Sequence, residues 1–114
     1  MKINSFEDII AWQKAQILTI QVYKAMKSCR DYSFKDQLQR AAVSIMNNIA
    51  EGYERNGNRE FRNFLYISKG SSAEVRSMLV LGSQLGFIPR NTAEELCEQA
   101  LEISKILSGL IKTL

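Results

Sequence analysis

The stretch RAAVSIMNNIAEGYER, residues 40–55, decides the fold class because its apolar and polar side chains recur with the period of an α-helix. Its polar members follow one another at spacings of three and four: Arg40, Ser44, Asn47, Glu51 and Arg55. At about 100° per residue these positions occupy about a third of the helix circumference, and an arc of roughly 200° is apolar. We call these five residues the polar stripe. The pattern predicts a helix with more apolar surface than one core contact requires.

The wide apolar arc includes Val43, Met46 and Ala50, for which a single bundle offers no obvious partner. A helix of an isolated bundle buries a stripe of roughly 100° or slightly more. Apolar patches left exposed usually mark an interface. The sequence therefore predicts self-association, and the alternative is that this helix is simply the most buried one.

The composition fits one small, mildly basic domain. A chain of 114 residues with 46% hydrophobic content builds a single core, so we expect one domain over residues 1–114. Lys and Arg total 15 against 12 Asp and Glu, a net charge of +3, which permits nucleic-acid binding without requiring it. Residues 1–30 and 56–88 are both net positive. A basic face would result if the first and third helices lay side by side.

Several classes of function lack their usual signals. The sequence has no His, and Cys29 and Cys97 are far apart without a CxxC motif, so we expect no metal and no cofactor. Ser44 has no evident base, and Glu51 is the only carboxylate of the polar stripe, so we expect no enzyme. Neither a signal-peptide pattern nor an apolar run of about 20 residues is present, so we expect a cytoplasmic protein without a membrane partner.

Start and stop signals predict four helices at about residues 5–29, 34–55, 59–85 and 92–112. Three starts have a capping-box-like spacing: Ser5 with Asp8, Ser33 with Asp36, and Asn91 with Glu94. Two ends fall at glycines that tolerate positive φ, Gly57 and Gly86. Short connections favour antiparallel neighbours. The sequence therefore predicts an all-α, antiparallel up-down-up-down four-helix bundle.

A run of small residues, Gly70-Ser71-Ser72-Ala73, lies in the middle of the third predicted helix. A glycine there costs about 1 kcal/mol of helix propensity. Small side chains let a neighbouring helix approach closely, or leave room for a large residue such as Trp12 or Tyr53. The alternative is a helix break at Gly70.

Three segments together resemble the four-helix-bundle family of 23S ribosomal RNA intervening-sequence proteins: FEDIIAWQKAQ (6–16), QLQRAAVSIMNNIAEGYERNGNREFRNFLYISKGSSAEV (37–75) and LGFI (85–88). The resemblance implies a small bacterial all-α protein, often a homo-oligomer and in the best-known cases a pentamer. It also implies a relation to accessory subunits of diversity-generating retroelements, which associate with a reverse transcriptase and nucleic acid. It implies no established enzymatic activity.

The polar stripe has two main interpretations. In the first, it belongs to a network that fixes the register between helices or subunits, with Glu51 paired to Arg40 or Arg55. This network would comprise Ser44, Asn47, Asn48 and Glu51 with the apolar Val43, Met46 and Ala50. In the second, the stripe lines a pore or groove of a ring and its arginines contact phosphates.

The resulting expectation is a non-catalytic, homo-oligomeric basic scaffold that binds structured RNA or DNA. Its candidate nucleic-acid contacts are Arg40, Arg55, Asn58, Arg59, Arg62, Lys14 and Lys24. Tyr53 and Tyr66 are candidates for stacking on bases, whereas Phe61, Phe64 and Trp12 fit the core better. The alternative is a protein-interaction adaptor that docks to a partner such as a reverse transcriptase and binds no nucleic acid itself.

Overall fold

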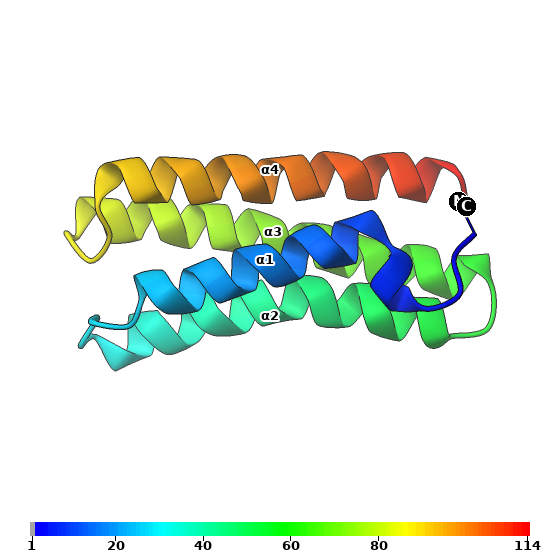
Figure 1. Ribbon diagram of the computed structural model, residues 1–114, viewed down its shortest axis with the longest axis horizontal. Coiled ribbons are helices and arrows are strands. Elements are labelled where there is room, and N and C mark those ends of the chain that lie inside the picture. Colours follow the sequence, from blue (N-terminus) through cyan, green and yellow to red (C-terminus); the bar gives the residue numbers. More distant parts are fainter. Residues whose placement is uncertain (1) are drawn as a thin grey trace.

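The structure, a computed structural model, describes residues 2–114 and forms a bundle of four long α-helices. They are α1 (Ile10–Ala25), α2 (Tyr32–Glu54), α3 (Asn58–Gln84) and α4 (Arg90–Lys112), preceded by the short 3-10 helix η1 (Phe6–Asp8). Each helix runs back along the one before it, and the segment that leads into η1 lies at the same end of the bundle as the end of α4 (Figure 1). The molecule measures 43 × 21 × 19 Å. The predicted all-α four-helix fold is confirmed.

The four helices form a closed ring in cross-section. α1 and α3 each pack against both α2 and α4. Within the described residues, α1 and α3 do not contact each other, and neither do α2 and α4. The first and third helices are therefore diagonal rather than adjacent, because short connections make consecutive helices neighbours. The basic face expected from placing them side by side does not form.

The helix starts differ from the predicted ones by a few residues. Asp8 does cap the N-terminal segment, since its Oδ2 accepts hydrogen bonds from the backbone N–H groups of Asn4 (2.9 Å) and Ser5 (3.3 Å). This cap opens only η1, and α1 begins after it at Ile10. α2 is capped by Asp31, whose Oδ1 accepts from the Phe34 N–H at 3.0 Å, so the prediction of Ser33 as its cap is wrong.

The ends of α3 follow the sequence signals closely. Gly57 precedes the helix with φ 98°, and Gly86 follows it with φ 79°. The Phe87 N–H donates to the Gly82 carbonyl (2.8 Å) and the Gly86 N–H to the Ser83 carbonyl (3.1 Å), which is a Schellman motif. After Pro89, α4 begins at Arg90, earlier than the expected cap at Asn91.

The core is apolar and includes a few buried hydroxyl groups at close helix contacts. α2 contributes Leu38, Ala41, Ala42, Ile45 and Ile49. The buried Ser68 hydroxyl donates to the Ile45 carbonyl of α2, and the buried Ser72 hydroxyl donates to the Ala100 carbonyl of α4, both at 2.7 Å. Each hydroxyl is thus satisfied where two backbones approach.

The small-residue run lies at close helix contacts, as one of the expectations had it, since Ser71 contacts α2 and Ser72 contacts α4. α3 continues through Gly70, so a helix break there is wrong. Ser71 and Ser72 are buried, whereas Gly70 and Ala73 are exposed. The expected large partners do not lie opposite the run. Trp12 packs edge-on against Phe6 and Tyr53 against Phe61, with ring centroids 5.2 and 6.0 Å apart.

The apolar excess predicted for α2 is smaller than expected. Met46 packs partly against the core, and Val43 and Ala50 are half-buried. The large apolar side chains that remain most exposed lie mainly on α1 and α3. No helix within residues 2–114 is both long and apolar enough to cross a membrane.

Candidate nucleic-acid interface

The inner edge of the polar stripe joins α2 to α3. The Ser44 Oγ lies 2.8 Å from the Ser71 Oγ of α3. The Asn48 Nδ2 donates to the Ser44 carbonyl at 2.8 Å and to its Oγ at 2.9 Å. All three side chains are partly or fully buried. This edge therefore sets the register between two helices of one chain.

The outer edge of the stripe is exposed and consists of local ion pairs. Glu51 pairs with Arg55 at 2.6 Å, which is one of the two pairings that the sequence left open. Arg40 pairs with Asp36 at 2.8 Å and not with Glu51, because Asp36 lies one helical turn before it. The hydrogen bond to Glu51 raises the pKa of Arg55, and its guanidinium lies 5.0 Å from the Phe64 ring centre.

A shallow cleft of about 430 Å³ follows the stripe along α2. It is lined by Tyr23, Arg40, Val43, Ser44, Asn47, Asn48 and Glu51. The cleft offers amide and hydroxyl groups, but its two charged residues are each paired. It is therefore a polar and electrically balanced surface. Sequence reasoning missed Tyr23, because only the packing of α1 beside α2 brings this residue to the cleft.

The predicted nucleic-acid contacts fall in three separate places. Arg55, Asn58, Arg59 and Arg62 surround the turn between α2 and α3. Arg40 lies 15 residues before Arg55, which is about 22 Å along the helix. The two lysines of α1 lie toward α4 instead.

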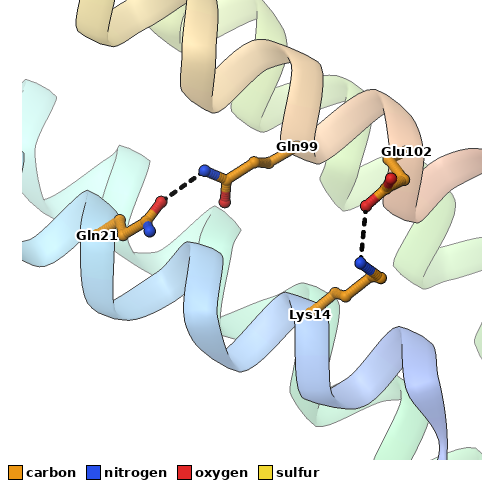
Figure 2. A network of polar contacts seen from close by, with 4 residues as sticks. All are labelled: Lys14, Gln21, Gln99 and Glu102. Atoms are coloured by element: carbon orange, nitrogen blue, oxygen red, sulfur yellow. Dashed lines mark hydrogen bonds and ion pairs between the residues drawn. The ribbon is translucent and has the colours of Figure 1, made fainter.

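The seam between α1 and α4 carries polar bridges (Figure 2). Lys14 Nζ lies 3.0 Å from Glu102 Oε1, and the Gln99 amide donates to the Gln21 Oε1 at 2.7 Å. Lys24 lines a cleft in the same seam. Lys14 therefore forms an ion pair with Glu102, and neither lysine lies beside the α2–α3 turn.

The family model of the 23S rRNA-intervening sequence proteins matches residues 7–109. The chain belongs to this family. A crystal structure at 1.70 Å resolution shows a similar fold, in a protein of unknown function from the S23 ribosomal protein family of Bacteroides thetaiotaomicron VPI-5482. The similarity has a TM-score of 0.84 at 24% identity, over 90% of this chain and 99% of that chain. No curated protein matches the chain.

This 23S rRNA-intervening sequence family member also has cations that the sequence reasoning did not select. Lys69 and Arg76 are half-buried on α3, like Arg62. The three are separated by seven residues each, a spacing visible in the sequence. That signal was overlooked because it only becomes meaningful once the facing helix is known.

The two cysteines of this family member are free thiols. Burial raises the pKa of the Cys97 thiol, while the nearby Arg76 acts in the opposite direction. Within residues 2–114, no three His, Cys, Asp or Glu side chains are grouped so that they could hold a metal ion.

Proposed function

We propose that this member of the 23S rRNA-intervening sequence family is a non-catalytic, homo-oligomeric scaffold that binds structured RNA or DNA. One observation carries the proposal: large apolar side chains are exposed on two helices that lie diagonally across the bundle. We call these surfaces the α1 face and the α3 face. Because the two faces lie on opposite sides of the bundle, each subunit can contact two neighbours. The net positive charges of the subunits then add up in one particle.

The α1 face consists of Ile10, Ile17 and Ile20. The α3 face consists of Tyr66, Ile67, Val80, Leu81 and Leu85. All eight side chains are between 44% and 56% exposed. In the described stretch from Tyr66 to Leu85, Glu74 is the only exposed residue with a charge. Several large apolar side chains exposed on one side of a helix are typical of an interface.

Small residues in the centre of the α3 face favour close packing. Gly70, Ala73 and Ser77 are all exposed between the apolar residues at the two ends of this face. A Cβ added to Gly70 would meet no atom within 4 Å. A helix of a second subunit therefore has room to approach here, with larger side chains on either side.

The placement of the two faces favours a ring over a symmetric dimer. In a dimer with twofold symmetry the same surface meets itself, whereas a ring joins two different surfaces head to tail. Two distinct faces on diagonal helices meet the second requirement. A net charge of +3 per subunit would give about +15 in a pentamer, enough for strong salt-dependent attraction to a polyanion.

The alternative function is a protein-interaction adaptor, for example one that docks to a reverse transcriptase. The same exposed apolar faces support it, because a different protein can cover them. The two functions differ at Arg59, which is exposed at the α2–α3 turn. Charge reversal at Arg59 weakens nucleic-acid binding in the scaffold and has no effect on an adaptor.

The assembly is tested by placing a charge on each face in turn. We expect Ile17→Lys and Leu81→Glu each to reduce the particle mass measured by light scattering, because a charge would be buried without a partner. Nucleic-acid affinity should fall with the mass, since fewer charges are joined in one particle. Tyr32→Lys is the matched control, because Tyr32 is 70% exposed and outside both faces. A wild-type protein that is monomeric at micromolar concentration would contradict the assembly.

A further inference from the structure

A straight row of cations follows α3 along its seam with α4. Arg62, Lys69 and Arg76 are seven residues apart, so they share one side of the helix at intervals of about 10.5 Å. Two contacts place this row beside α4. Arg62 donates to the Leu114 carbonyl at 2.7 Å, and the Cys97 thiol of α4 donates to the Arg76 carbonyl at 3.8 Å.

These three cations lack acidic partners although all three are half-buried. Among residues 2–114, the ion pairs are Lys14–Glu102, Arg40–Asp36, Arg55–Glu51 and Arg90–Glu94. None includes Arg62, Lys69 or Arg76. The Arg76 Nε is buried and has no hydrogen-bond partner. Long basic side chains can bury their stems while the charged head stays in water, so cations outside any ion pair are free to meet an anion.

The exposed side of α4 next to this seam divides into an acidic and a basic half. Glu94 and Glu98 line the cleft between α3 and α4 near Arg90. Lys105 and Lys112 follow Glu98 at intervals of seven residues, so they lie on the same face of α4. Both lysines are exposed. Glu94 and Glu98 thus lie beyond Arg76, and Lys105 and Lys112 lie toward the other end of α4, where the nearby Glu102 is paired with Lys14 of α1.

The spacing of the cations indicates the shape of the ligand. A compact anion such as a single phosphate needs converging donors, whereas neighbours about 10 Å apart cannot all contact it. A linear polyanion presents repeated charges along a line and can contact each cation in turn. The row also begins beside the α2–α3 turn, where Asn58 and Arg59 are exposed.

We propose that Arg62, Lys69, Arg76, Lys105 and Lys112 form a track that binds the phosphate backbone of one nucleic-acid strand. The proposal rests on the proposed function and names the surface that performs it. The track reads no base sequence, because its cations meet phosphates alone. It is separate from the polar stripe, where the arginines are already paired.

The test compares two double variants with the same change in charge. Lys69→Gln with Lys105→Gln removes two track cations. Lys27→Gln with Lys35→Gln removes two lysines from the connection after α1 and the start of α2. Anisotropy of a labelled DNA duplex is recorded at several salt concentrations for both variants and the wild type. Circular dichroism and light scattering verify that fold and mass are unchanged.

We expect the track variant to bind more weakly. The slope of its log affinity plotted against log salt concentration should be flatter by about 1.8, which is about 0.9 per lost phosphate contact. The Lys27/Lys35 control should keep the slope of the wild type. Equal slopes for the two variants, with a wild type that binds, would overturn the track alone. No binding by the wild type at low salt would overturn the proposed function and the track together.

Discussion

Gly52 and Gly70 both lie inside long helices, but of the two only Gly52 lies where a side chain does not fit. A Cβ on Gly52 would stand 2.6 Å from the Phe64 Cβ and 3.1 Å from the Phe61 Cδ1. The Phe64 Cβ is attached to the backbone and cannot swing away. Gly52 therefore permits α2 and α3 to approach, whereas Gly70 faces open space.

The same substitution should have opposite effects at these two glycines. We expect Gly52→Ala to lower the free energy of unfolding by about 1–3 kcal/mol, because the added methyl group overpacks the contact with Phe64. Gly70→Ala should raise it by up to about 1 kcal/mol, since alanine favours the helix and meets no neighbour. Urea unfolding of both variants measures the difference. Equal effects at the two positions would show that the contact at Gly52 does not control the α2–α3 distance.

At the scale of the elements, helix number and order could be predicted, whereas some helix starts could not. Gly86 was predictable because it follows the last apolar position of the helical period and Pro89 comes three residues later. The start of α2 was not, because Asp31 and Ser33 are both good caps and the choice depends on which side chain reaches a free N–H group. Asp31 reaches Phe34, and Ser33 lies inside the helix.

The contact between Ser44 and Ser71 can be measured as a coupling between α2 and α3. We expect Ser44→Ala to cost about 1–2 kcal/mol, because it leaves the Ser71 hydroxyl without this partner in a buried place. The double variant Ser44→Ala with Ser71→Ala should cost less than the sum of the two single changes, by roughly 0.5–1.5 kcal/mol. Strictly additive costs in urea unfolding would mean that the two hydroxyls do not set the register.

At the scale of the whole molecule, the ring order of the helices determines which residues can act together. The sequence placed Lys14 and Lys24 with the arginines of α2 and α3, but α1 is diagonal to α3. Lys14 pairs with Glu102 across the α1–α4 seam instead. Conversely, Arg76 and Lys69 became candidates only when the structure placed their side of α3 next to α4. Periodicity predicts the side of a helix on which a residue lies, and only packing decides its neighbours.

The α1 and α3 faces also become visible only at this scale. The sequence pointed to α2 as the source of the interface, because its apolar arc is wide. In the bundle α2 contacts both α1 and α3, which half-bury the edges of that arc. The exposed apolar surface therefore lies on the two diagonal helices α1 and α3, and we assign the proposed subunit interface to these helices rather than to α2.

The central claim is that an assembled particle binds nucleic acid directly through its charge. The most direct measurement is fluorescence anisotropy of a labelled hairpin RNA and a labelled DNA duplex against the wild-type protein at several salt concentrations, with the mass determined by light scattering on the same sample. We predict an oligomer whose log affinity falls linearly with log salt for both probes, because binding releases counterions. A well-formed oligomer that binds neither probe at low salt would contradict the account.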